Sequence, residues 1–311
     1  MTHVLAPQQP FHASPNAPRA VSFDRVTRRF GATTALDDVS FDIPIGSTVA
    51  LLGPNGAGKS TAINVMLGLL HASDGRALTL GLEPRRAVQA GRVGAMLQSS
   101  GLPTGCTVSE LVDFSRTLYP GPLSLDAALG AARLTDLASR RVETLSGGET
   151  QRLRFALAVA GDPDLVFLDE PTVAMDVETR HVFWADMRRY AAEGRTVLFA
   201  THYLEEADQV ADRVVVLDHG RIVADGTPGS IKSAASGRTV RFTLPAADEA
   251  ALGRIPGVTT VTIRGDSVTL ASSDADSTVA ALYAAGLPIR DLEVTGANLE
   301  SAFLAITSAG D

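Results

Sequence analysis

The stretch GPNGAGKST, residues 53–61, decides the fold of this 311-residue chain. It matches the pattern G-x-x-x-x-G-K-[ST], with an apolar strand expected before it at Ser47–Leu52 and a helix after it at Lys59–Leu69. Glycines let a loop curl so that successive backbone N–H groups point at phosphate oxygens, and the following helix adds its positive N-terminal dipole. The stretch therefore predicts a strand–loop–helix unit that binds the phosphates of a nucleotide.

The side chains of this loop have distinct expected roles. We expect Lys59 to reach the β- and γ-phosphates, Ser60 to offer its hydroxyl to Mg²⁺, and Thr61 to hydrogen-bond a phosphate oxygen. The candidate nucleotide-binding residues are all nine of the loop, namely Gly53, Pro54, Asn55, Gly56, Ala57, Gly58, Lys59, Ser60 and Thr61.

A second stretch, LVFLDE at residues 165–170, predicts a buried strand that ends in two carboxylates. Asp169 would then lie at the carboxyl edge of the sheet beside the phosphate loop, where it can help to hold Mg²⁺. Glu170 is the candidate that orients and deprotonates an attacking water. Together the two stretches predict hydrolysis of a nucleoside triphosphate.

Short apolar runs alternate with helical patterns over residues 20–230, which we expect to form one domain after a disordered tail at 1–19. This alternation is typical of a parallel sheet covered by helices. An antiparallel arrangement is expected for Ser40–Ile43 and for the pair Val214–Leu217 and Arg221–Asp225. The expected strands of the alternating region are Ala20–Phe23, Ser47–Leu52, Val93–Leu97, Leu165–Leu168, Thr196–Ala200 and Arg213–Leu217, with further helices at Gly148–Ala160 and Val177–Glu193.

A small-residue linker at 232–237 predicts a second domain at 238–311. Its expected elements are a strand at 238–244, a helix at 246–254, strands at 258–264 and 267–271, a helix at 275–285, a strand at 288–294 and a helix at 298–307. The order βαββαβ indicates a small α+β, ferredoxin-like unit with one additional helix.

Composition excludes several classes of protein. With 27 basic and 35 acidic residues the net charge is −8, and nucleic-acid binding needs clustered Lys and Arg, so no nucleic-acid partner is expected. The single cysteine, Cys106, excludes an internal disulfide framework and a Cys-based zinc site. No stretch approaches the ~18 to 20 consecutive apolar residues of a membrane-spanning helix.

Residues 145–149, LSGGE, make the chain recognisable. They lie between the two nucleotide motifs and are followed by Gln151 and Arg152. Over about residues 21–226 the chain resembles the nucleotide-binding subunit of an ATP-binding cassette (ABC) transporter. The motifs that carry the resemblance follow in order: GPNGAGKST, Gln98, LSGGE, LVFLDEPT, the loop of Asp176, and His202. The resemblance implies an α/β P-loop ABC cassette with a mostly parallel sheet, an antiparallel β subdomain and a helical subdomain.

The resemblance also implies residue roles around one ATP. Phe30 would stack on adenine, although the family more often has Tyr there and a plain core role is the alternative. Gln98 would touch Mg²⁺ and the attacking water and sense a membrane partner. His202 would contact the γ-phosphate as the switch histidine.

Other residues would act across a subunit boundary. Ser146, Gly147 and Gly148 would contact the γ-phosphate held by the opposite subunit, and Asp176 would make cross-subunit contacts, although the loop 173–176 departs from the common pattern. Since the chain holds one phosphate loop and one LSGG signature, a head-to-tail dimer with two ATP molecules is expected. ATP would close this dimer, and hydrolysis to ADP and phosphate would reopen it.

The implied partners are separate transmembrane permease subunits, which would contact the segment 98–120 and hold the chain peripherally at the cytoplasmic face of the membrane. The ending at 298–307 resembles that of cassettes from bacterial ABC-2 type exporters for drugs and antibiotics, which favours export over import. Two alternatives remain: a soluble ABC-type ATPase of translation or DNA repair, and an adaptor that binds ATP but hardly hydrolyses it. Intact Glu170 and His202 argue against the adaptor.

Overall fold

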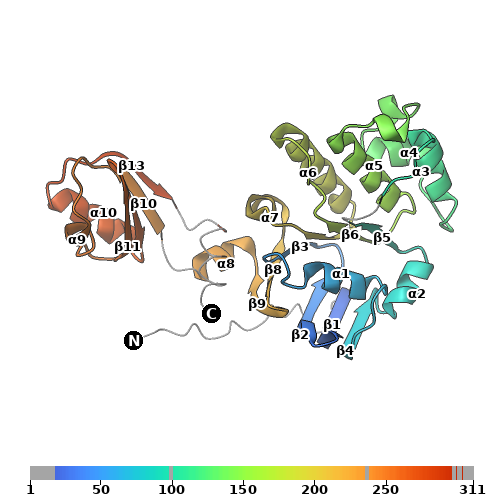
Figure 1. Cartoon of the computed structure of the whole chain (residues 1–311), viewed down its shortest axis with the longest axis horizontal. Helices are drawn as coiled ribbons and strands as arrows, with labels where there is room; N and C mark the ends of the chain where they lie inside the picture. The colour runs from blue at the N-terminus through green and yellow to red at the C-terminus, as the bar shows by residue number, and fades with distance from the viewer. Residues whose placement is uncertain (1–17, 98–100, 235–237, 296–298, 300–302, 304–311) are drawn as a thin grey trace. The chain divides into compact units, whose positions relative to one another are not determined.

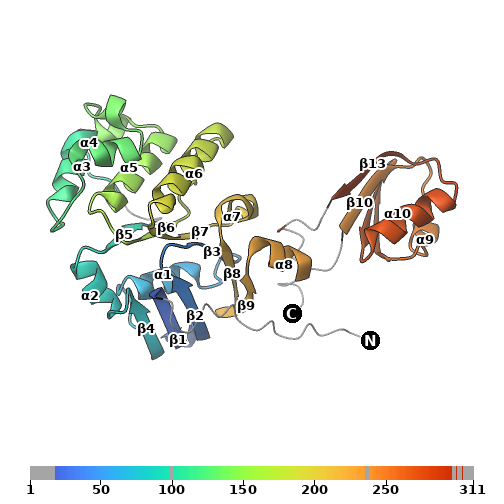
Figure 2. The ribbon, with the colours of Figure 1, turned by 180° about the vertical axis from the view of Figure 1, so that it is seen from behind.

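The computed structural model describes residues 18–97, 101–234, 238–295, 299 and 303. The chain divides into two compact units, Met1–Thr227 and Pro228–Asp311 (Figures 1 and 2). This division lies close to the predicted domain boundaries, 20–230 and 238–311, which stay predictions.

The first unit is built on a six-stranded sheet with the order β5-β6-β7-β3-β8-β9. The first five of these strands are parallel, and β9 pairs with β8 in the antiparallel sense, as predicted. Every residue of β3, β6, β7 and β8 is buried, because helices cover both faces of a parallel sheet. The strands are β3 (Thr48–Leu52), β5 (Val93–Met96), β6 (Leu165–Asp169), β7 (Thr196–Ala200), β8 (Arg213–Asp218) and β9 (Arg221–Gly226).

The helices that cover this sheet lie on its two sides. Figure 1 shows α1 and α2 on one side and α5, α6 and α7 on the other. Helix α1 ends three residues earlier than predicted, because Gly68 adopts a left-handed φ of +68° and packs on the backbone of Arg85. The bounds are α1 (Lys59–Met66), α2 (Pro84–Gln89), α5 (Gly147–Val159), α6 (Val177–Ala192) and α7 (Leu204–Val210).

A three-stranded antiparallel sheet, in the order β2-β1-β4, contributes to the same hydrophobic core. Its strands are β1 (Arg19–Phe30), β2 (Thr33–Pro44) and β4 (Asp74–Thr79). The prediction that the first strand ends at Phe23 was wrong. The strand continues through register shifts between Phe23 and Val26 and between Val26 and Arg28, and such bulges interrupt the two-residue alternation that marks a strand in the sequence.

A helical subdomain separates β5 from β6. It contains α3 (Val108–Arg116), α4 (Leu125–Ala131) and two 3₁₀ turns, η1 (Thr135–Leu137) and η2 (Val142–Thr144). Helix α3 begins at a capping box formed by Thr107 and Glu110.

The second unit holds α8 (Pro228–Ala234), β10 (Arg238–Thr243), α9 (Glu249–Leu252), β11 (Val258–Arg264), β12 (Ser267–Ser272), α10 (Ala275–Ala284) and β13 (Arg290–Thr295). Its antiparallel sheet has the order β11-β12-β10-β13. This arrangement and the element order from β10 to β13 are those of the predicted ferredoxin-like unit.

Two predicted boundaries in this unit were wrong, and most of one predicted helix lies outside the described residues. Residues 232–234 of the predicted linker belong to α8. Helix α9 is shorter than the predicted 246–254, because Ala246 has a left-handed φ of +52° and the Asp248 side chain caps the helix start. The predicted helix 298–307 lies outside the described residues except for Leu299 and Phe303, both of which are helical.

Candidate active site

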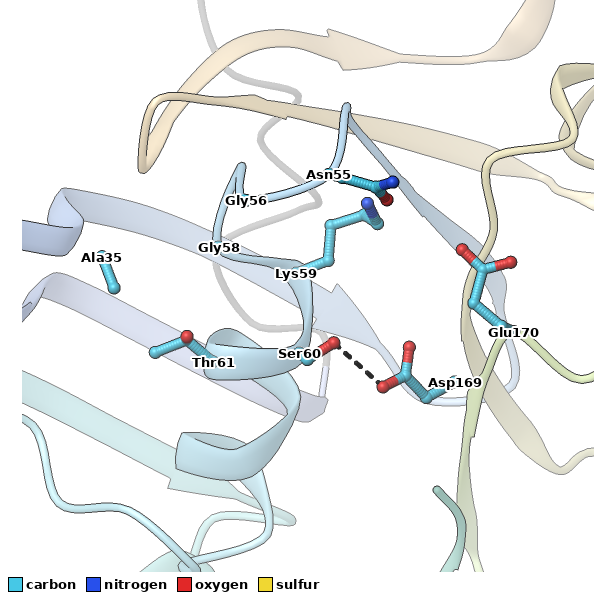
Figure 3. A pocket seen from close by; sticks show the side chains of 9 residues that line it. All are labelled: Ala35, Asn55, Gly56, Gly58, Lys59, Ser60, Thr61, Asp169 and Glu170. Atoms are coloured by element: carbon cyan, nitrogen blue, oxygen red, sulfur yellow. Dashed lines mark hydrogen bonds between the residues drawn. The ribbon is translucent and has the colours of Figure 1, made fainter. Parts of the chain in front are cut away.

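A cleft of about 270 Å³ lies where the phosphate loop meets the carboxyl end of β6. Figure 3 shows the carboxylates of Asp169 and Glu170 facing the loop residues Lys59 and Ser60. The cleft is lined by Ala35, Asn55, Gly56, Gly58, Lys59, Ser60, Thr61, Asp169 and Glu170. Sequence analysis predicted all of these except Ala35.

Two glycines of the loop have no room for a side chain. A Cβ at Gly58 would lie 2.5 Å from the Ala35 carbonyl oxygen, and one at Gly53 would lie 2.3 Å from the Leu217 carbonyl oxygen. Gly58 also has a left-handed φ of +106° and caps the start of α1. The loop is therefore pinned between β2 and β8, with the N-terminus of α1 directed to the cleft.

Lys59 is buried, with 7% of its surface exposed. Its Nζ donates hydrogen bonds to the carbonyl oxygens of Gly53 (2.7 Å) and Pro54 (3.0 Å). Burial lowers the pKa of Lys59, and the charges of Glu170 and Asp169 oppose this shift. An anion in the cleft would meet this ammonium at the base of the loop.

The Ser60 hydroxyl donates to Asp169 Oδ2 at 3.0 Å. Burial raises the pKa of Asp169, whereas the Ser60 hydrogen bond and the Lys59 charge work in the opposite direction. A hydroxyl and a carboxylate oxygen are the hard ligands that Mg²⁺ prefers. Within the described ranges, no group of three or more His, Cys, Asp or Glu residues could hold a metal ion. The Ser60 and Asp169 oxygens therefore fit as two of the ligands of Mg²⁺.

Glu170 and His202 form a pair at the ends of neighbouring strands. His202 Nδ1 lies 2.7 Å from Glu170 Oε2, and the Glu170 amide donates to the Ala200 carbonyl at 2.9 Å. Glu170 is buried and has a left-handed φ of +53°, whereas the His202 side chain is 49% exposed. Non-glycine residues rarely adopt this conformation, and it is concentrated at functional sites.

The signature residues lie outside the cleft. Ser146, Gly147 and Gly148 are not among its lining residues. Ser146 caps α5 in a capping box with Glu149, and both Ser146 and Gly147 are exposed. The N-terminus of α5, with its positive dipole, is therefore exposed and does not contribute to the chain's own cleft.

Asp176 lies beside the signature and caps the start of α6. It accepts hydrogen bonds from the amide and hydroxyl of Thr179, which lower its pKa. A Cβ at Gly147 would lie 3.2 Å from the Ala174 carbonyl oxygen. The signature and the Asp176 loop therefore form one surface.

Of the two remaining predicted site residues, the structure describes Phe30 but not Gln98. Phe30, at the end of β1, is 44% exposed, so the alternative that it is a core residue was wrong. It does not line the cleft, and the Arg28 guanidinium lies 4.5 Å from its ring centre. Gln98 lies outside the described residues.

Sequence analysis missed a buried carboxylate behind the pair. Glu206 on α7 accepts hydrogen bonds from Thr172 and Thr201. In the structure Glu206 shares the buried face of α7 with Val210, one turn further on, while its neighbour Glu205 is exposed.

A phosphate loop after β3 of a parallel sheet, with two carboxylates at the carboxyl end of β6 in the same sheet, defines a P-loop nucleoside triphosphatase. A model of the ABC transporter family matches residues 36–173. The daunorubicin/doxorubicin resistance ATP-binding protein DrrA of Streptomyces peucetius is 34% identical over 307 residues, covering 93% of this chain and 92% of the relative. Nod factor export ATP-binding protein I of Paraburkholderia xenovorans (strain LB400) is 38% identical over 219 residues, covering 68% of this chain and 72% of the relative.

Solved structures agree with these relatives. An ATP-binding subunit of an ABC transporter is 27% identical, with a TM-score of 0.62 over 69% of this chain and 92% of that one. A dimeric ATP-binding cassette bound to ADP and phosphate, in a post-hydrolysis state, is 26% identical, with a TM-score of 0.60 over 67% of this chain and 98% of that one. The chain belongs to the ABC transporter family, as an ATPase with the family's cassette fold.

Proposed function

We propose that this chain is the ATP-hydrolysing subunit of a membrane exporter of bacterial type. The observation that carries the proposal is the cleft in which Lys59, Ser60 and Asp169 face Glu170, itself paired with His202. DrrA is named for drug resistance and the Paraburkholderia relative for Nod factor export. The second name associates a relative of this chain with outward transport.

The chemistry follows from the side chains of the cleft. Ser60 and Asp169, together with Gln98, would hold Mg²⁺, whose positive charge would offset the negative charge of the phosphates. Lys59 and the loop amides bind the β- and γ-phosphates, and Thr61 adds a hydrogen bond. Glu170 accepts the proton of the attacking water, while His202 contacts the γ-phosphate and holds the carboxylate in place. Phe30 stacks on adenine.

The working form is a head-to-tail dimer with two ATP molecules. Each cleft lacks a signature of its own, because Ser146, Gly147 and Gly148 are not among the residues that line it. The exposed N-terminus of α5 would stabilise the γ-phosphate bound by the other subunit. Loss of that anion on hydrolysis removes the attraction and reopens the dimer.

The membrane partner is a separate permease, which holds the chain at the cytoplasmic face of the membrane. No helix in the described ranges is both long and apolar enough to span a bilayer. Two large apolar side chains are exposed here: Phe114 on α3, with 63% of its surface exposed, and Leu118, two residues after the end of α3, with 68% exposed. They lie within the segment 98–120 and offer an apolar surface to a helix of the permease.

The proposal is tested with the tagged E170Q variant, which should bind ATP and retain it. We expect the variant, with ATP and Mg²⁺, to capture a protein with several hydrophobic spans from gently solubilised native membranes. Adding F114S and L118S should abolish the capture, whereas V223S, at a residue 41% exposed on β9, should not. An E170Q chain that dimerises with ATP but captures no membrane protein would contradict the exporter function.

A further inference from the structure

The carboxylate of Glu206 lies in a buried polar cluster behind the Glu170–His202 pair. Only 4% of Glu206 is exposed. Its Oε1 accepts a hydrogen bond from the Thr172 hydroxyl at 2.5 Å, and its Oε2 accepts one from the Thr201 hydroxyl at 2.8 Å. The Arg180 guanidinium is 3.5 Å from Oε1. Both oxygens are therefore occupied by partners within the protein.

These partners belong to the segments that carry the reacting side chains. Thr172 follows Glu170 by two residues after β6, and Thr201 immediately precedes His202 after β7. A single carboxylate on α7 thus ties together the two strand ends. Fully satisfied buried polar groups of this kind hold their neighbours in one arrangement.

The cluster also reaches the His202 ring. The Tyr203 ring lies 4.1 Å from the His202 ring, and the Arg180 guanidinium lies 4.2 Å from the centre of the Tyr203 ring. Arg180 is on α6, and its amide donates to Asp176, the cap of that helix. The Glu206 carboxylate therefore contacts Arg180. Arg180 packs on the Tyr203 ring, which in turn packs on the His202 ring.

We propose that Glu206 is a positioning residue for ATP hydrolysis. Its carboxylate holds Thr172 and Thr201 in register, so that Glu170 and His202 keep their 2.7 Å contact beside the cleft. It does not act on the nucleotide, because it is not among the residues that line the cleft. The inference rests on the roles proposed above for Glu170 and His202.

The first test compares steady-state ATP hydrolysis by the full-length chain and its E206A and E206Q variants. We expect E206A to lower kcat at least tenfold while KM for ATP stays within twofold, since the phosphate loop is intact. E206Q should recover part of kcat, because its amide can still pair with both threonine hydroxyls. The matched control is D225N, which removes the charge of another buried carboxylate, one paired with Arg213 on β8. Equal kcat values for E206A and D225N would overturn the proposal.

A double-mutant cycle separates positioning from general destabilisation. If Glu206 acts through His202, E206A should lower the single-turnover rate of the H202A chain less than twofold. An equal loss in the H202A and unmodified backgrounds would overturn the proposal. Full activity of E170Q or H202A alone would instead overturn the roles proposed for Glu170 and His202. This result distinguishes a failure of the proposed function from a failure of the Glu206 proposal.

Discussion

At the scale of the residue, burial disfavours the charged form of the Asp169 carboxyl group in the nucleotide-free chain. Burial raises its pKa above the ordinary value of 3.8. A carboxyl group with a raised pKa favours folding most below the ordinary pKa, and this contribution is lost as the pH rises through the raised value. At neutral pH the charge therefore costs stability in the nucleotide-free chain.

The D169N variant should consequently have a higher Tm than the unmodified chain at pH 7 in the absence of nucleotide and Mg²⁺. The difference should shrink as the pH falls toward 3.8, where the native carboxyl group is itself protonated. Thermal unfolding over a pH series measures this, with D266N, at an exposed position, as the control that leaves Tm unchanged. A lower Tm for D169N at pH 7 would mean that the charge stabilises the empty site.

At the scale of the element, two helices begin with the same capping box. Ser146 and Glu149 cap α5, and Thr107 and Glu110 cap α3. Removing either hydroxyl, in S146A or T107A, should lower the free energy of unfolding by about 1 kcal/mol in urea titrations. Only S146A should also slow ATP hydrolysis, because Ser146 is proposed to contact the partner's γ-phosphate. Equal hydrolysis by the two variants would contradict that role.

The elements also show what sequence patterns can and cannot reveal. The phosphate loop was predictable because Gly53 and Gly58 have no room for a side chain, and β6 was predictable because both of its faces are buried. The full length of β1 was not, because bulges near Val26 break the alternation. The Glu206 cluster was not either, since Thr172 lies 34 residues away along the chain and approaches only after β6 and β7 pair.

At the scale of the whole molecule, each chain is proposed to supply the phosphate loop of one ATP site and the signature of another. Its cleft holds the phosphate loop and Glu170, while the exposed start of α5 holds Ser146. ATP should therefore join two chains, and the junction should depend on the signature.

The most direct test is the mass in solution of the E170Q chain, measured by sedimentation with and without ATP and Mg²⁺. We predict twice the 32.5 kDa of one chain with ATP, and a single chain without it or when S146R is added to E170Q. A single chain at saturating ATP, or an S146R/E170Q chain that dimerises equally well, would contradict the account.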